Sequence, residues 1–176
     1  MAVKSKKRTA ATVCFVVLTL AAIFCAGIFG INYIRQGEKA SRSVKVISAQ
    51  NASEIAERII EKTDLNSVLK LKNEQISKYY GVPMDIINES VVYKSQSATE
   101  IDEIAVFRVS DKGTAEIVTT AIDDRLTECR SSYSVLNNED SQKIENCLVE
   151  SSGEYIILVI CDDTVSAGEA IAEFYQ

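Results

Sequence analysis

The chain has 176 residues, a net charge of −6, and no His and no Trp. The acidic balance argues against binding to nucleic acid or to anionic lipid headgroups. Because His is the commonest general base and metal ligand, its absence excludes most hydrolase templates, including the Ser-His and Cys-His nucleophile pairs.

The first element is a long apolar run, residues 9–34, which contains no charged residue. About 20 apolar residues suffice to cross a bilayer, so this run predicts an uncleaved single-pass transmembrane helix. Its apolar core is roughly twice as long as that of a secretory signal, although cleavage after Ala26 or Gly30 stays an alternative that would give a secreted form. A lipid-anchored form would need acylation of Cys25, but Phe24 stands where that signal requires a small residue.

The charges around the run predict its orientation. Residues 1–8 carry four cations, whereas the far flank has Arg35 and Lys39 interrupted by Glu38. The positive-inside rule therefore predicts a basic cytoplasmic tail over residues 1–8 and places the rest of the chain outside the cell membrane. Beyond the run there are 15 Lys and Arg against 25 Asp and Glu, which is typical of a soluble domain.

Residues 35–50 are polar and are expected to form a tether, followed by one domain over residues 51–176. Asn51 and Glu54 form a capping-box pattern that predicts a short amphipathic helix. Residues 65–71 are ambiguous between helix and strand. A brief helix is expected after them and ends at Gly81.

The second half of the domain alternates strands and helices. Strands are expected around Val91, over 104–109, over 144–149 and over 155–161, with residues 137–142 as a loop. Capping residues open one helix after each pair of strands: Asp111 for the long helix that runs to Tyr133, and Asp163 for the last helix. Strand-strand-helix thus occurs twice, which predicts an α+β domain with a four-stranded antiparallel sheet and two helices on one face.

The strand over residues 156–160 is apolar on both of its faces. This predicts a central strand that is covered on both sides. The helix near residues 55–60, or a partner, is expected to supply the second cover.

Several short motifs between Leu65 and Gln176 resemble a family of Clostridia and their relatives, family 4358 in the domain-of-unknown-function series. The motifs are Tyr80-Gly81-Val82, the Glu103-Ile104-Ala105-Val106 strand before a long helix with Arg125, Tyr133 followed by Asp140 and Asn146, and Gly153-Glu154-Tyr155 with a closing Asp162. Many members of that family look like secreted lipoproteins, whereas this chain has an anchor in place of a clear lipobox. The resemblance implies a location and a fold class, and it supplies no activity and no catalytic residue.

Three acidic pairs are candidate sites, and their positions favour structural roles. They are Asp123 with Asp124, Glu139 with Asp140, and Asp162 with Asp163. None has the spacing of a calcium loop, so no metal site and no cofactor are predicted.

A cell-wall hydrolase that uses two carboxylates is the rival hypothesis, and Asp102 with Glu103 is its only candidate pair. Adjacent strand residues point to opposite faces, which makes them poor partners. A serine-lysine pair from Ser110 or Ser166 with Lys112 lacks the SxxK spacing. We therefore predict no catalytic residue.

The leading hypothesis is a non-catalytic binding or assembly module of the cell envelope. Its predicted partners are the membrane and either an envelope protein or a second copy, because Ala22, Ala26 and Gly30 would let two membrane helices approach closely. No nucleic acid and no small-molecule ligand is predicted. A sensor role is limited, since eight cytoplasmic residues leave no room for a signalling domain.

Two sets of residues stay open at this point. The pairing of Cys129, Cys147 and Cys161 is undecided, although small buried side chains are expected. Tyr79, Tyr80, Tyr93 and Tyr133 are candidate contact residues if exposed, and aromatic residues at these spacings are more often part of a core.

Overall fold

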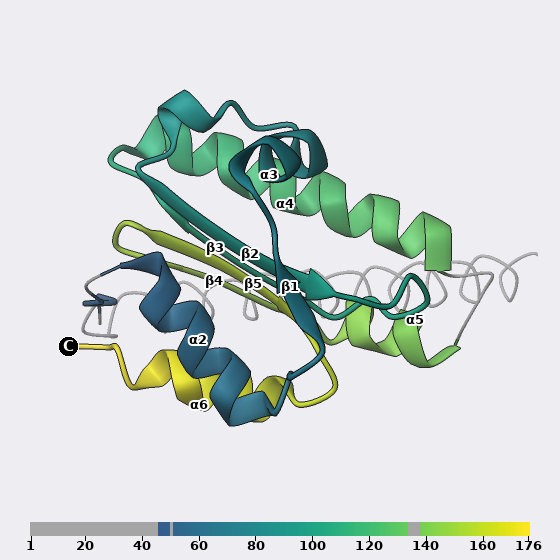
Figure 1. The fold of residues 1–176 in the computed structure, drawn as a ribbon. Helices are drawn as coiled ribbons and strands as arrows, with labels where there is room; N and C mark the ends of the chain where they lie inside the picture. Colours follow the sequence, from purple (N-terminus) through teal and green to yellow (C-terminus); the bar gives the residue numbers. More distant parts are fainter. Residues whose placement is uncertain (1–45, 50, 134–137) are drawn as a thin grey trace, which may run out of the picture. The chain divides into compact units, whose positions relative to one another are not determined.

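The computed structural model describes residues 46–49, 51–133 and 138–176, and these residues form an α+β domain (Figure 1). The expected transmembrane helix and cytoplasmic tail lie outside the described residues. Within the described part, no helix has the length and apolar character needed to span a membrane. In chain order the elements are α2 (Ala52–Thr63), β1 (Val68–Lys70), α3 (Asn73–Tyr80), the 3-10 turn η1 (Met84–Ile86), β2 (Glu89–Ser95), β3 (Glu103–Arg108), α4 (Lys112–Tyr133), α5 (Asn138–Glu145), β4 (Leu148–Ser152), β5 (Tyr155–Ile160) and α6 (Thr164–Ala172).

The strands form one antiparallel sheet of five strands in the order β1-β2-β3-β5-β4. The prediction of an antiparallel sheet is confirmed, but the predicted number of four strands is wrong. The additional strand is β1, which pairs with β2 at the edge of the sheet. β1 has only three residues, and none of its side chains is buried. A segment this short shows no alternation of apolar and polar residues by which a strand could be predicted from the sequence.

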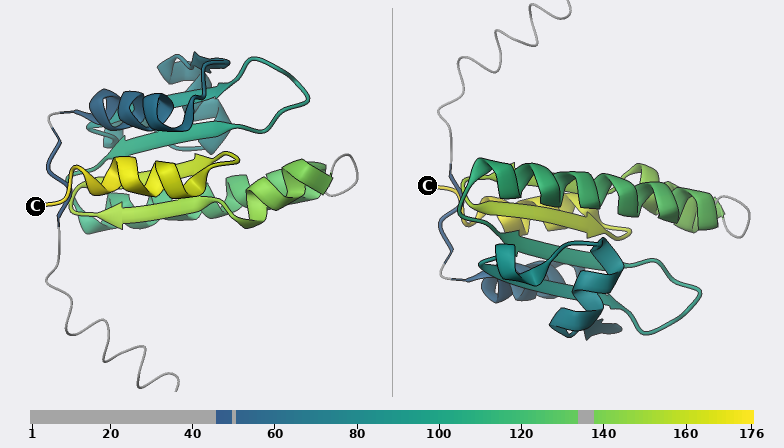
Figure 2. Two further views of the ribbon diagram at one scale, coloured as in Figure 1. Left: turned by 90° about the horizontal axis from the view of Figure 1, so that it is seen from below. Right: turned by 90° about the horizontal axis from the view of Figure 1, so that it is seen from above.

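Helices cover both faces of the sheet. α3 and α4 lie on one face, and α2 and α6 lie side by side on the other (Figures 1 and 2). The central strands alternate between these layers: Ala105 and Phe107 of β3 pack toward α4, whereas Ile104 and Val106 pack toward α2. All six residues of β5 are buried, which confirms the prediction of a strand covered on both sides. The second cover comes from the layer that α2 shares with α6: α6 contacts β5, whereas α2 contacts β2 and β3.

The two helices that follow strand pairs were expected on one face, and this expectation is wrong. α4 packs on one face of the sheet and α6 on the other. The last apolar residue of each strand explains the difference, because Val109 after β3 faces the α3–α4 layer and Cys161 after β5 faces the α2–α6 layer. Each helix packs on the face to which that last side chain points.

Helix ends follow the capping residues closely. The side chains of Asn51, Asp111 and Asp163 each accept a backbone N–H three residues later, at 2.9 Å. α3 ends before Gly81, which adopts φ +65°. Residues that carry a Cβ atom disfavour this left-handed conformation, whereas glycine adopts it readily.

The stretch before β4 differs from the prediction. Residues 138–145 form helix α5, although 137–142 were expected as a loop, and β4 is Leu148–Ser152 where 144–149 was expected. α5 has a single large apolar side chain, Ile144, which is buried. With one apolar residue in eight, no helical period was visible in the sequence.

The start of the described chain packs against its end. Ile47 is buried and forms an isolated antiparallel bridge with Tyr175. The Tyr155 hydroxyl also donates to the carbonyl of Ala49 at 3.1 Å. Residues 46–49, which belong to the segment expected as a tether, therefore contact the domain.

Candidate functional site

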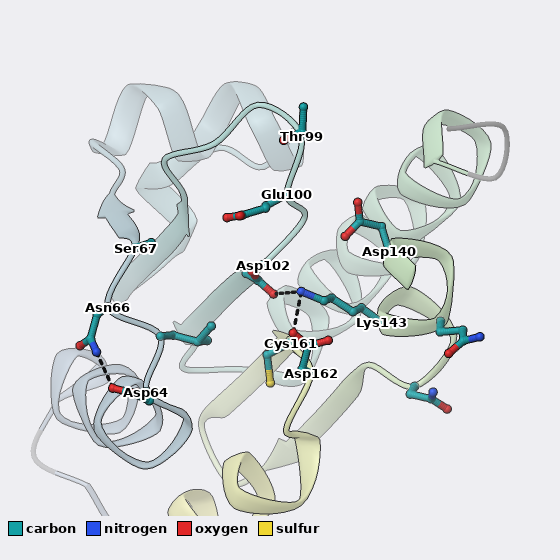
Figure 3. A pocket seen from close by; sticks show the side chains of 13 residues that line it. Asp64, Asn66, Ser67, Thr99, Glu100, Asp102, Asp140, Lys143, Cys161 and Asp162 are labelled. Carbon is teal, nitrogen blue, oxygen red and sulfur yellow. Dashed lines mark hydrogen bonds and ion pairs between the residues drawn. The ribbon is translucent and has the colours of Figure 1, made fainter. Parts of the chain in front are cut away.

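One end of the sheet gathers connections from distant parts of the chain. Because the strands are antiparallel, the start of β1, the end of β2, the start of β3 and the end of β5 lie at the same end. The backbone ties these connections together, since Gln96 donates to the carbonyl of Ser67 at 3.0 Å and Ser95 donates to that of Asp102 at 2.8 Å. A cavity of about 770 Å³ opens there, and we call it the sheet-end cleft (Figure 3).

Carboxylates predominate among the described residues that line the cleft. Its charged residues are Asp64, Glu100, Asp102, Asp140, Lys143 and Asp162. The cleft therefore has a negative potential that favours positively charged groups.

Lys143 of α5 lies between two of these carboxylates, as Figure 3 shows. Its ammonium is 3.0 Å from Oδ1 of Asp102 and 2.9 Å from Oδ2 of Asp162. Burial alone would lower the pKa of Lys143, but its hydrogen bonds to Asp162 and Asp102 outweigh burial and raise the pKa. Lys143 is therefore a cation at neutral pH and cannot act as a general base.

Glu103 follows Asp102 directly and lies on the opposite face of the strand, beneath α3 and α4. It is fully buried and accepts hydrogen bonds from the Tyr80 hydroxyl and from Nη2 of Arg125, the latter at 2.9 Å. Tyr79 stacks on this arginine, with its ring centroid 4.3 Å from the guanidinium. The structure thus separates the two carboxylates that the hydrolase hypothesis required.

Burial and charge change the pKa values of this buried group. Burial, and then the charge of Glu103, raises the pKa of Tyr80. Burial alone would lower the pKa of Arg125, but the charge and hydrogen bond of Glu103 raise it. Tyr80 therefore stays a hydrogen-bond donor and Arg125 stays charged, which makes this group a structural ion pair.

The remaining acidic candidates divide between the surface of α4, the start of α6 and the cleft. Asp123 and Asp124 are exposed on α4, and Asp163 caps α6. Asp162 and Asp140 both line the cleft. The side chain of Glu139 lies outside the described residues.

Neither serine candidate forms a serine-lysine pair in the described structure. The Ser110 hydroxyl donates to Oδ1 of Asn88. The Ser166 hydroxyl donates to Oδ2 of Asp163 at 2.6 Å. Lys112 begins α4 and is exposed.

The three cysteines among the described residues are free thiols: Cys129 and Cys161 are buried and Cys147 is half-buried. Cys161 lines the cleft, where burial raises its pKa to about 11. A thiol with this pKa is protonated at neutral pH and is a poor nucleophile. Within the described residues no group of three or more Cys, Asp or Glu side chains is placed to hold a metal ion.

The tyrosines divide between core and surface. Tyr80 is buried and Tyr93 is half-buried, whereas 37% of Tyr79 is exposed. The side chain of Tyr133 lies outside the described residues. Tyr79 is therefore the exposed candidate contact residue of the three that are described.

The sequence pointed to Asp102 but not to its partners. Lys143 and Asp162 lie 41 and 60 positions further along the chain. Lys143 belongs to the helix that the apolar pattern did not reveal. Glu103 carried a clearer signal, because it is a carboxylate next to the apolar run Ile104–Phe107.

Comparison with known proteins gives one match. The family described as a domain of unknown function (DUF4358) matches residues 61–161, a range that includes all five strands of the described sheet. No curated protein and no solved structure matches the chain. The match spans more than half of the chain, and the protein therefore belongs to the DUF4358 family.

Proposed function

We propose that the protein is a non-catalytic binding module of the cell envelope. In this proposal residues 9–34 anchor the chain in the membrane, with residues 1–8 in the cytoplasm and the α+β domain outside. The sheet-end cleft binds a basic segment of an envelope protein. The observation that carries the proposal is the cleft itself, about 770 Å³ in volume, in which carboxylates outnumber the single lysine.

Charge complementarity supports a basic partner. Asp162 has a side chain that is 82% exposed, so its carboxylate is accessible while it contacts Lys143. A Lys or Arg side chain from a partner can bind such a carboxylate without displacing the protein's own lysine. Complementary charges of this kind steer association and select between partners.

The chemistry of the cleft argues against the hydrolase alternative. A glycosidase needs one carboxylic acid that keeps its proton and one carboxylate that acts as nucleophile or base. Asp102 and Asp162 are the two carboxylates that lie close together, and both contact the same ammonium. Lys143 lies between them, in the space that a sugar would have to occupy, so the pair does not fit the arrangement of a glycosidase.

Site-specific crosslinking in the native host tests the binding proposal. A photo-reactive residue at Gln142, an exposed residue of the cleft, is compared with one at Asp123, which is exposed on α4. We expect a discrete adduct with an envelope protein from position 142 only, and a weaker adduct when Asp162→Lys is added. The same adduct from both positions, or an adduct that Asp162→Lys does not weaken, would overturn the proposal.

Labelling of intact cells tests the location. Glu61 is exposed on α2, so Glu61→Cys supplies a reactive thiol in a chain whose described native cysteines are buried or half-buried. We expect a membrane-impermeant maleimide to label this variant in intact cells, with the unchanged chain as the control. Labelling only after the cells are lysed would place the domain in the cytoplasm.

The hydrolase alternative predicts a different result. Asp102→Asn combined with Asp162→Asn removes both neighbouring carboxylates of the cleft. The binding proposal expects wall turnover to persist at an unchanged rate in this variant. A loss of turnover with the folded domain still present would favour the hydrolase.

A further inference from the structure

A second cavity lies on the α3–α4 layer, beside the buried ion pair and away from the sheet-end cleft. It has a volume of about 510 Å³, and we call it the Arg125 pocket. Its described lining residues come from α3, α4 and the residue after β1: Leu71, Gln75, Lys78, Tyr79, Arg125 and Glu128. None of them belongs to the cleft.

Arg125 is held rigidly at the wall of this pocket. Its side chain is only 9% exposed, and it is fixed by Glu103 on one side and by the stacked ring of Tyr79 on the other. Such a guanidinium loses little conformational freedom when it binds a ligand, because its plane is already set.

The guanidinium retains unused hydrogen-bonding capacity. Its Nε is buried and has no hydrogen-bond partner among the described residues. Its Nη1 is 3.9 Å from Oε2 of Glu128, which is too long for a hydrogen bond. Glu128 is an exposed residue of the pocket rim, so its carboxylate forms a long ion pair with the guanidinium and no hydrogen bond.

The surroundings favour an organic anion. Lys78 and Gln75 add donors at the rim, and Leu71 and the Tyr79 ring add apolar surface. A further cation, Lys94, lies 5.2 Å from the Tyr79 ring centroid. In a domain with a large excess of carboxylates, this is a local concentration of cations.

We propose that the Arg125 pocket binds a carboxylate of a small organic ligand, such as the free C-terminus of a peptide. Arginine binds the planar carboxylate group well, and Lys78 supplies a second positive contact. The negative charges of Glu103 and Glu128 disfavour a dianion, so the pocket selects a carboxylate over a phosphate. This site is independent of the cleft, and it departs from the expectation of no small-molecule ligand.

A titration of the full-length, ¹⁵N-labelled protein in detergent micelles tests the proposal by NMR. The probes are N-acetyl-alanyl-alanine, the same peptide with a C-terminal amide, and inorganic phosphate. We expect the free acid to shift the backbone amide signals of Gln75, Lys78 and Tyr79, with no saturable shift from the amide or from phosphate. Equal shifts from acid and amide, tighter binding of phosphate, or no shift with any probe would each overturn the proposal.

Two surface variants make the test specific, and neither removes a buried group. Lys78→Gln should weaken binding of the acid about tenfold, because one charge-assisted hydrogen bond is lost. Glu128→Gln should strengthen it about threefold, because a like charge leaves the rim. Asp123→Asn, on the same helix as Glu128, is the matched control for Glu128→Gln and should leave the affinity unchanged. If Asp123→Asn strengthened binding as much as Glu128→Gln, the effect would be one of general charge and would contradict the site.

Discussion

Asp102 and Glu103 are neighbours in the chain, yet they serve two different regions of the molecule. Asp102 faces the sheet-end cleft, where its partner Lys143 also contacts the exposed Asp162. Glu103 faces the α3–α4 layer, where it is fully buried with Tyr80 and Arg125. Consecutive residues thus place one carboxylate at the wall of the cleft, 8% exposed, and the next in the core, fully buried.

The difference between the two regions is whether a charge keeps a partner when another is lost. In the cleft, Lys143 and Asp102 each have only 12% of the side chain exposed, but Lys143 also contacts Asp162, whose side chain is 82% exposed, so loss of Asp102 leaves the lysine with a counter-charge. In the core, each charge depends on its partner for solvation, so loss of one partner is costly. We therefore expect changes near Glu103 to unfold the domain and changes near Asp102 to alter binding.

Arg125→Gln should have the largest effect. It leaves Glu103 buried without its counter-charge, which typically costs about 3–5 kcal/mol. The free energy of unfolding, measured with urea, should fall by this amount at pH 8. A loss below about 1 kcal/mol at pH 8 would contradict the buried ion pair.

Tyr80→Phe should have the next largest effect. It removes the hydroxyl that donates to Glu103 and keeps the ring that packs edge-on against Phe107. Loss of a buried hydrogen bond to a charged group costs about 1–3 kcal/mol. Tyr79→Phe is the matched control, since it retains the stacked ring, and urea unfolding should show a change within about 0.5 kcal/mol.

Lys143→Gln should destabilise the domain by about 1 kcal/mol at pH 8, because it removes the charge-assisted hydrogen bond to Asp102 and the contact with the exposed Asp162. The pKa of Lys143 is raised in the folded state. Its contribution to the free energy of unfolding is therefore complete below the unfolded pKa of about 10.4 and is lost as the pH rises through the folded pKa. The difference between the unchanged chain and the variant should therefore shrink between pH 8 and pH 11. A difference that stays constant over this range would exclude the ion pairs as its cause.

Glu173→Gln should have the smallest effect. Glu173 joins α6 to α2 through ion pairs with Arg58 and Lys62 at the surface. Its hydrogen bonds to Arg58 and Lys62 lower its pKa to about 2, so its contribution is present above the unfolded pKa of about 4.3 and is lost as the pH falls toward 2.

Thermal unfolding of the unchanged chain and of Glu173→Gln should therefore differ slightly at pH 6 and coincide near pH 2. High salt should also reduce the difference at pH 6, because it screens exposed charges. A difference that is largest at pH 2 would have the wrong sign for a lowered pKa.

Much of the fold could be predicted because its signals are local. Strong apolar runs marked β2, β3 and β5, and side-chain caps such as Asp111 marked where α4 and α6 begin. The short edge strand β1 and the polar helix α5 have neither an apolar run nor a repeating apolar pattern, so the sequence did not reveal them. The face on which each helix packs depends on strand register, which Val109 and Cys161 reveal only once the sheet is known.

The candidate sites could be predicted only in part. Alternation along a strand correctly separated Asp102 from Glu103. The partners of both carboxylates come from distant segments of the chain. Lys143 binds Asp102, and Tyr80 and Arg125 bind Glu103. A single sequence does not reveal such pairings, because they arise from tertiary packing and leave no local pattern in the sequence.

The most direct test compares Asp102→Asn with Glu103→Gln in the full-length protein in detergent micelles, using urea unfolding followed by circular dichroism. The two variants change neighbouring carboxylates to amides and remove one negative charge each. We predict a loss of about 1 kcal/mol for Asp102→Asn and of about 3–5 kcal/mol for Glu103→Gln, which leaves Arg125 without its counter-charge. Equal losses, or a larger loss for Asp102→Asn, would contradict the division between a buried structural ion pair and an open binding cleft.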